Sequence, residues 1–96
     1  MNKHFVYILF SEVYGKFYIG QTNNLEKRME EHNKSTNASF TSKYRPWQLY
    51  CELSCSNRSV GVRIEKYLKK KPRDFIRRIR KEEDLRNYIL ERFEES

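Results

Sequence analysis

The pattern of hydrophobic positions along the chain first predicts strands. Between Lys3 and Phe10, aromatic and β-branched residues occupy both alternating sets of positions, which predicts a strand that is buried on both faces and central in its sheet. Residues 11–15 form a turn, and the stretch from Lys16 to Gly20 returns as the antiparallel partner. Apolar and polar residues alternate again from Trp47 to Leu53, which predicts a third strand. The inner face of this strand is expected to carry Trp47, Leu49, Cys51 and Leu53.

Helical spacing, with apolar residues three and four positions apart, accounts for most of the remaining chain. Because asparagine is a favoured N-cap, the first helix is expected to begin after Asn23 or Asn24, and the second after Ser56-Asn57. Pro72 ends that second helix and is well placed to begin a third. A tail helix from residue 82 to residue 94 follows. The second helix has the apolar stripe Val60, Ile64, Tyr67 and Leu68, and the third has Phe75, Ile76 and Ile79.

One face of the first helix mixes apolar and polar side chains. Leu25 and Met29 mark this face as the buried one. Arg28 and His32 share the same face at helical spacing, so we expect them to point inward or along the seam between helix and sheet. That placement is unusual for packing and suits a functional site.

The order of elements is strand, strand, helix, strand, helix, helix and tail helix. It predicts an α+β fold in which a small, mostly antiparallel, three-stranded sheet is flanked by helices. The polar segment from residue 33 to residue 43 is long for a connector in so small a domain, which favours a functional or mobile loop. Residues 1–81 are expected to form the domain. Residues 82–96 would be an acidic C-terminal helix or tail that packs on the domain or on another chain.

Composition and charge narrow the class of protein. The chain has 96 residues and a net charge of +7, and ten Lys or Arg against two Asp or Glu fall between residues 63 and 81. Such a basic block is the electrostatic footprint of a polyanion binder, although a solvated helix face is the plainer alternative. Without a long apolar run or a signal cleavage site, we expect no membrane span and a cytoplasmic location. Cys51 and Cys55 lack zinc-site spacing and are expected to be free thiols.

Several short motifs follow one another in an informative order. Val6-Tyr7 is followed at short distance by Tyr18-Ile19-Gly20, and the first helix then carries Arg28-x-x-x-His32. A single glutamate, Glu65, lies on the helix after the third strand, which itself begins with Arg45-Pro46-Trp47. In order and spacing, this set resembles the GIY-YIG nuclease domain, in particular its small single-domain bacterial members.

The resemblance covers most of the chain, from Lys3 to about Lys81. Phe5 stands at the glycine position of the first motif, and Gln21 stands where some members carry a lysine. Certain relatives also use an asparagine beyond the glutamate, and none lies between Glu65 and Lys81 here. These departures concern catalysis more than fold.

The resemblance implies hydrolysis of phosphodiester bonds with one divalent metal ion, Mg²⁺ or Mn²⁺. Glu65 would bind the ion, because Mg²⁺ keeps several waters and completes its shell with phosphate oxygens. Arg28 would hold a non-bridging phosphate oxygen through its planar charged fork. Tyr7 or Tyr18 would orient or deprotonate the attacking water. His32 would hydrogen-bond a phenol and take the proton in relay.

Each of these side chains also has a plainer interpretation. Arg28 could lay its stem over Met29, and the tyrosines could be core residues with satisfied hydroxyls. His32 could complement the helix dipole, and Glu65 could pair with Lys69 one turn away. It is the whole constellation that favours a site.

Nucleic-acid binding is expected to use the basic block and the polar loop. The candidate contact residues are Gly20, Gln21, Lys43, Arg45, Lys69, Lys70, Lys71 and Arg73. Because phosphate contacts carry no sequence information, we expect DNA to be cut with little base specificity, with branched, nicked and single-stranded forms all open. A protein partner would supply any further specificity, in DNA repair or recombination. The alternative is a catalytically weak nucleic-acid-binding module on the same scaffold.

Overall fold

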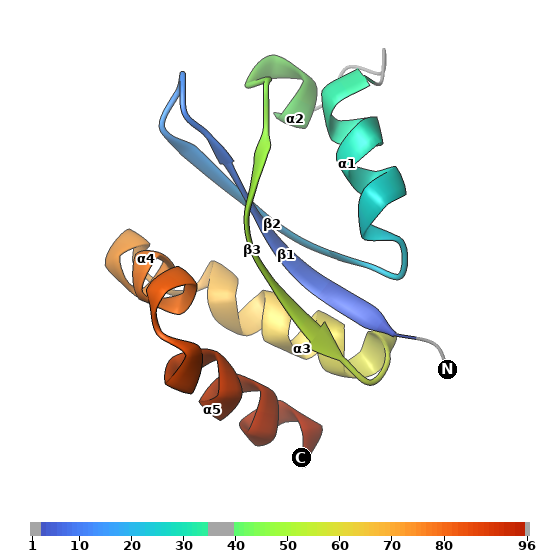
Figure 1. Ribbon diagram of the computed structural model, residues 1–96, viewed down its shortest axis with the longest axis vertical. Helices are drawn as coiled ribbons and strands as arrows, with labels where there is room; N and C mark the ends of the chain where they lie inside the picture. Colours follow the sequence, from blue (N-terminus) through green and yellow to red (C-terminus); the bar gives the residue numbers. More distant parts are fainter. Residues whose placement is uncertain (1–2, 35–39, 96) are drawn as a thin grey trace.

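The computed structural model describes residues 3–34 and 40–95, which form three strands and five helices (Figure 1). In chain order these are β1 (His4–Ser11), β2 (Lys16–Thr22), α1 (Leu25–Lys34), α2 (Phe40–Lys43), β3 (Gln48–Cys55), α3 (Arg58–Lys69), α4 (Arg73–Lys81) and α5 (Glu83–Glu94). The predicted order is confirmed, with one addition. The short helix α2 lies in the segment expected to be a loop, of which residues 35–39 fall outside the described residues. No helix in the described ranges is long and apolar enough to cross a membrane.

The sheet has the strand order β2-β1-β3, and both pairings are antiparallel. Val6 and Ile8 on one face of β1, and Tyr7 and Leu9 on the other, are at most 1% exposed. The prediction of a central strand buried on both faces is therefore confirmed. The α+β class is confirmed with it.

The prediction of a single inner face for β3 is wrong. The pairing of β3 with β1 shifts register so that Leu49 and Cys51 oppose successive residues of β1, which leaves Tyr50 as an extra residue in a β-bulge. The bulge reverses the alternation of side chains. Leu53 packs toward α3 while Trp47 packs on the opposite face, and Leu49 is 42% exposed.

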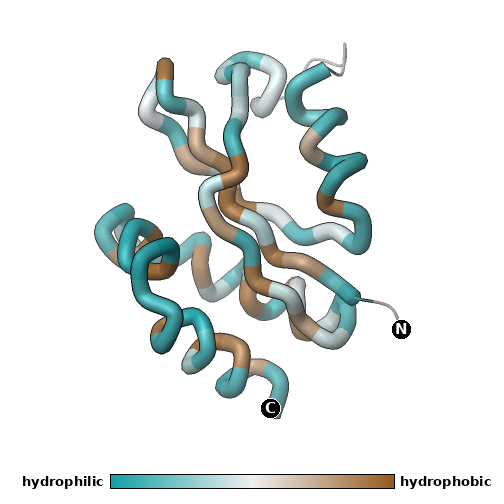
Figure 2. The backbone as a smooth tube through the Cα atoms, viewed as in Figure 1, coloured by the Kyte–Doolittle hydropathy of each residue, from teal (hydrophilic) through white to brown (hydrophobic). Residues whose placement is uncertain are grey.

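The helices cover both faces of the sheet. Helices α3, α4 and α5 lie on one side, and α1 and α2 lie on the other (Figure 1). The larger cluster, which we call the apolar core, consists of Val6, Ile8, Leu53, Cys55, Val60, Ile64, Leu68, Ile76, Ile79 and Ile89. It unites the predicted stripes of α3 and α4 with the tail helix α5, which packs on the domain. Figure 2 shows hydrophobic stretches along the strands and shorter ones alternating with hydrophilic stretches in the helices.

The smaller cluster, which we call the aromatic core, lies between the sheet and α1. Its buried members are Tyr7, Leu9 and Trp47, against which Tyr18, Leu25, Met29 and Tyr44 pack. Asparagine caps position the helices on both sides as predicted. The side chain of Asn24 accepts a hydrogen bond from the amide of Lys27 at 3.1 Å, and that of Asn57 accepts one from Val60 at 3.0 Å.

Candidate active site

Tyr7 is the most deeply buried member of the predicted site, at 1% exposure. Its hydroxyl lies 2.9 Å from Nε2 of His32. Gly20 lies directly opposite on β2, and a Cβ atom there would be 2.5 Å from the Tyr7 hydroxyl. Glycine at this position therefore makes room for the phenol. Burial, and after it the neighbouring Tyr18, raises the pKa of Tyr7 above its usual value.

His32 lies on the last turns of α1 and is 6% exposed. Burial, and after it the positive charge of Arg28, lowers the pKa of His32 below its usual value. Since both shifts favour the neutral forms, the pair joins a neutral phenol to a neutral imidazole, and in the tautomer with its proton on Nδ1 the Tyr7 hydroxyl donates to Nε2. The backbone carbonyl of His32 accepts a hydrogen bond from Nε of Arg45 at 2.8 Å, which fastens this end of α1.

The second tyrosine is close to the first, but on a diagonal. In the pairing of β1 with β2, Tyr7 opposes Gly20 and Tyr18 opposes Leu9. Their ring centroids still lie 6.4 Å apart, and Tyr18 lies 5.0 Å from the His32 ring. Tyr18 is half-buried, so it is more accessible to water than Tyr7.

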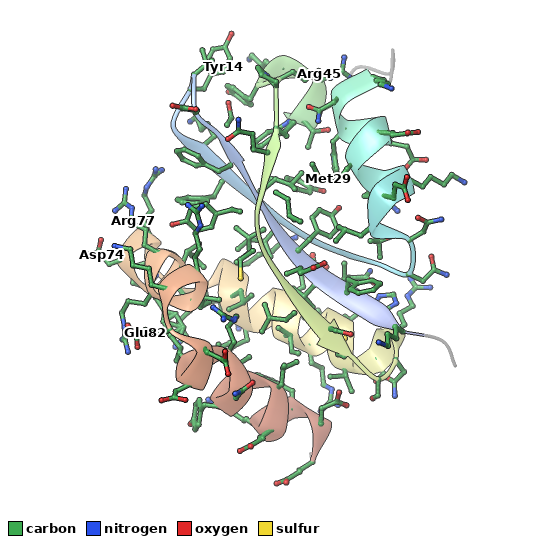
Figure 3. All side chains as sticks on the ribbon, in the orientation of Figure 1. Tyr14, Met29, Arg45, Asp74, Arg77 and Glu82 are labelled. Atoms are coloured by element: carbon green, nitrogen blue, oxygen red, sulfur yellow. The ribbon has the colours of Figure 1, made fainter. Side chains whose placement is uncertain are left out.

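Arg28 lies along the seam of α1 at the rim of the site. Its side chain is 45% exposed, and Nε lies 3.4 Å from a carboxylate oxygen of Glu31. Its positive charge nevertheless contributes to the pKa values of both Tyr7 and His32. In each case the contribution of Arg28 lowers the pKa, although burial raises the pKa of Tyr7 overall. In Figure 3 the labelled Met29 reaches from α1 toward the sheet, one residue along from Arg28.

Glu65 lies on α3, which packs against β2 and β1. Its side chain is 20% exposed, and Oε2 forms an ion pair with Nζ of Lys69 at 2.5 Å. The structure therefore contains the ion pair that is the plainer interpretation of Glu65. Its charge also helps to raise the pKa of Tyr7. The carboxylate is therefore within electrostatic reach of the buried phenol.

Glu65 is also the residue to test as a metal ligand. Within the described part of the chain, no three His, Cys, Asp or Glu side chains form a cluster that could hold an ion. A fully protein-ligated ion such as zinc does not fit this donor set. A single carboxylate that is 20% exposed fits a hydrated Mg²⁺ ion, which needs one or two carboxylates.

Several basic candidates for nucleic-acid binding have intramolecular partners. Arg45 donates to His32, and Lys69 pairs with Glu65. Arg73 donates to the carbonyl of Gly15 at 2.8 Å. These side chains help hold the fold together, and a contact with nucleic acid would be an additional role.

The other candidates differ in how much surface they offer. Lys43 and Lys70 are exposed at helix ends, and Lys71 lies 4.5 Å from the centre of the Tyr67 ring. Gln21 is half-buried and hydrogen-bonds His4. Gly20 is buried under the Tyr7 hydroxyl.

Sequence reasoning missed the group that holds the aromatic core in place. Asn33 belongs to α1, and its side chain bonds both the amide and the carbonyl of Trp47, at 2.7 and 3.0 Å. The indole of Trp47 donates to the carbonyl of Thr41 at 2.7 Å, and its ring lies 6.2 Å from that of Tyr18. An asparagine in a polar segment carries no signal of such a distant partner, although Figure 3 shows how close α1, α2 and the labelled Arg45 lie.

The fold and this set of side chains define a class of protein. A family model described as the GIY-YIG catalytic domain matches residues 3–81, and the chain belongs to this family of nucleases. The UPF0213 protein of Bacillus licheniformis is 35% identical over 69 residues, which is 72% of this chain and 70% of that protein. The UPF0213 protein YazA of Bacillus subtilis is also 35% identical over 69 residues, covering 72% and 69%.

A solved structure supports the same fold. The solution NMR structure of a UPF0213 protein from Bacillus halodurans has a TM-score of 0.50 and 25% sequence identity, over 80% of this chain and 81% of that one. The expected resemblance to small GIY-YIG proteins is therefore confirmed.

Proposed function

We propose that this chain is a metal-dependent endonuclease that hydrolyses DNA phosphodiester bonds with little base specificity. The observation that carries the proposal is the gathering of Tyr7, Tyr18 and His32 on one face of the sheet. Arg28 at the rim and Glu65 on α3 both act on the pKa of Tyr7. Membership of the GIY-YIG family supports nuclease chemistry.

Tyr7 and His32 would move the proton from the attacking water. Because the pKa of Tyr7 is raised, the phenol stays protonated at neutral pH and cannot act alone as a base. The hydrogen bond to His32 provides a relay, in which Tyr7 takes the proton of water as its own proton passes to Nε2. Tyr18 is accessible enough to orient the water.

The two charged groups would act on the phosphate. Arg28 would bind a non-bridging oxygen, for which its position at the rim and its exposure are suitable. Glu65 would hold one Mg²⁺ or Mn²⁺ ion, exchanging part of its pairing with Lys69. Such an ion, when bound, supplies charge neutralisation at the phosphate and at the leaving oxygen.

The proposal is tested by incubating supercoiled and branched DNA with Mg²⁺, Mn²⁺ or EDTA. Wild type is compared with Glu65→Gln and with Glu91→Gln, which removes an exposed carboxylate from α5 as a matched control. Wild type and the control should cut only with metal, and Glu65→Gln should cut roughly 100-fold more slowly or not at all. Cutting by Glu65→Gln at the wild-type rate would contradict the proposal.

The ion pair between Glu65 and Lys69 favours one alternative, a nucleic-acid-binding module with little catalytic power. That module would bind DNA in every metal condition and cut in none. In either case residues 1–81 would carry the site, α5 would brace α3, and a partner protein would supply specificity for branched, nicked or single-stranded DNA. Salt dependence of binding would measure how far phosphate contacts dominate.

A further inference from the structure

Two adjoining hollows open at the end of the sheet where β1 begins. The larger has a volume of about 590 Å³, and its lining includes Lys3, Phe5, Asn57 and Arg58. The smaller has a volume of about 250 Å³, and its lining includes Gln21, Thr22 and Arg28. The two share His4, Asn23 and Arg58. The larger volume falls within the roughly 300–1,000 Å³ of small-molecule sites.

The charge of this lining favours an anion. Lys3, Arg58 and Arg28 are cationic, and no Asp or Glu of the described residues lines either hollow. A third hollow beside α1, of about 180 Å³, is lined instead by Glu26 and Glu30 together with Lys27 and Asn24. The molecule therefore offers a cationic and an acidic depression for comparison, and only the first attracts phosphate.

A carboxylate on α5 is hydrogen-bonded to a residue that lines the larger hollow. Glu94 accepts hydrogen bonds from the amide and the hydroxyl of Ser56, at 2.9 and 2.5 Å, and Ser56 lines the larger hollow. These two bonds hold the carboxylate on α5 at the edge of the hollow.

His4 lines both hollows and is held in place by its neighbours. His4 is 7% exposed, and Nε2 hydrogen-bonds the side-chain oxygen of Gln21. Gly61 on α3 leaves room for the imidazole, since a Cβ atom there would lie 2.6 Å from Cδ2 of His4. The proposed catalytic machinery makes no use of this buried histidine.

Phe5 adds an aromatic ring to the larger hollow. It is half-buried and lies two residues before Tyr7 on β1, so the two side chains are on the same face of the sheet. Phe5 is also the residue that stands in place of the glycine of the first family motif. An accessible ring beside cationic groups is the arrangement on which unpaired bases stack.

Arg28 joins the hollows to the candidate active site. It lines the smaller hollow, and its charge reaches both Tyr7 and His32. Gln21, in the same hollow, directly follows the glycine that lies under the Tyr7 hydroxyl. A strand held at Arg28 can therefore continue along the hollows.

We propose that the two hollows form a subsite for one unpaired nucleotide next to the phosphate that is cut. Phe5 stacks on its base, while Arg58 and Lys3 hold its phosphate. The inference rests on the proposed nuclease function, because that function places the phosphate that is cut beside the subsite. Binding of the unpaired nucleotide needs neither metal nor catalysis.

The phosphate contact is tested by fluorescence anisotropy of a fluorescein-labelled oligothymidylate of about 12 nucleotides, in EDTA. Arg58→Gln should weaken binding roughly tenfold and lower the salt slope of log K by about 0.7, as expected for one lost contact with a single strand. Lys27→Gln removes the same charge from the acidic hollow and should leave both values near those of wild type. Equal affinities for the two variants would overturn the subsite.

The stacking contact is tested by Phe5→Leu and Phe5→Tyr, with circular dichroism as the check on folding. Phe5→Leu should weaken binding of the oligothymidylate roughly tenfold and binding of a blunt duplex much less, and Phe5→Tyr should restore wild-type affinity. Equal losses on both probes would overturn the assignment of Phe5. If the variants behave as expected while wild type cuts no DNA with Mg²⁺ or Mn²⁺, the nuclease proposal fails and the subsite stands.

Discussion

On one face of β1, Val6 and Ile8 pack among aliphatic side chains of α3, α4 and α5. On the other face, Tyr7 packs with Leu9 and Trp47 beside the imidazole of His32. The apolar core contains one titratable group, the thiol of Cys55, whose pKa is raised by burial. The aromatic core is smaller and borders most of the candidate active site.

The two faces therefore divide most of the apolar packing from most of the candidate site. A buried aliphatic side chain contributes roughly 1.5–3 kcal/mol by leaving water, and it needs no polar partner. A buried phenol and a buried imidazole each cost free energy unless they are hydrogen-bonded. The hydrogen bond between Tyr7 and His32 offsets this cost but is not a main source of stability. The apolar core is what permits a polar group inside so small a domain. Three substitutions and one change of pH test this division, from the largest expected effect to the smallest.

Ile64→Ala should have the largest effect on stability. Ile64 is fully buried in the apolar core, so its truncation should lower the free energy of unfolding by roughly 2–5 kcal/mol, measured by urea denaturation. Val62→Ala, at a half-buried position on the same helix, is the control and should cost less. Folded Ile64→Ala protein should keep the Tyr7–His32 pair. Equal losses in the two variants would contradict the division.

Gly20→Ala should damage the site more than the fold. The added Cβ would lie 2.5 Å from the Tyr7 hydroxyl, so the ring must move, at a cost of roughly 1–3 kcal/mol. DNA cleavage should fall with it, and the NMR titration of His32 should change. Gly15→Ala is the control, because Gly15 has a φ of 63° and, its chain neighbours aside, no atom of the described residues lies within 4 Å of the added carbon. It should cost about 1 kcal/mol through backbone strain and leave the titration of His32 unchanged.

Lowering the pH should destabilise the protein through His32. Because its pKa is lower in the folded than in the unfolded state, the folded protein binds this proton less readily. The stability is complete above the ordinary pKa of about 6.5 and is lost as the pH falls below it, by at most about 1.4 kcal/mol per pH unit. Urea titrations between pH 7 and 5 should show this slope in wild type. A slope just as steep in His32→Gln would assign it to other groups.

Arg78→Gln should have the smallest effect. Arg78 and Glu82 form a 2.9 Å ion pair on the surface, with side chains 58% and 45% exposed. Exposed pairs are screened by solvent, so the urea midpoint should equal that of wild type within error. A clear loss of stability would mean that the surface of α4 contributes more than its exposure indicates.

Much of this architecture follows from local pattern. The central strand, the asparagine caps and the stripes of α3 and α4 were predicted because side chains alternate in strands and recur at 3.6 residues in helices. The motif order singled out Tyr7, Tyr18 and His32, whose side chains lie together in the structure, and Arg28, whose charge acts on Tyr7 and His32. Their chemical roles stay predictions until the variants are measured.

Other features depend on partners distant in the chain. The bulge at Tyr50 moved Trp47 to the face opposite Leu53, because pairing with β1 set the register. Arg45, a candidate contact for nucleic acid, donates a hydrogen bond to a backbone carbonyl of α1, which no local pattern indicates. Sequence alone thus determined which segments form elements and which side chains are candidates for a site, since both depend on neighbours a few residues away. Tertiary structure decided which face each side chain reaches and which charges are already paired. These features depend on contacts between distant residues, which the repeat of hydrophobic positions along the chain does not encode.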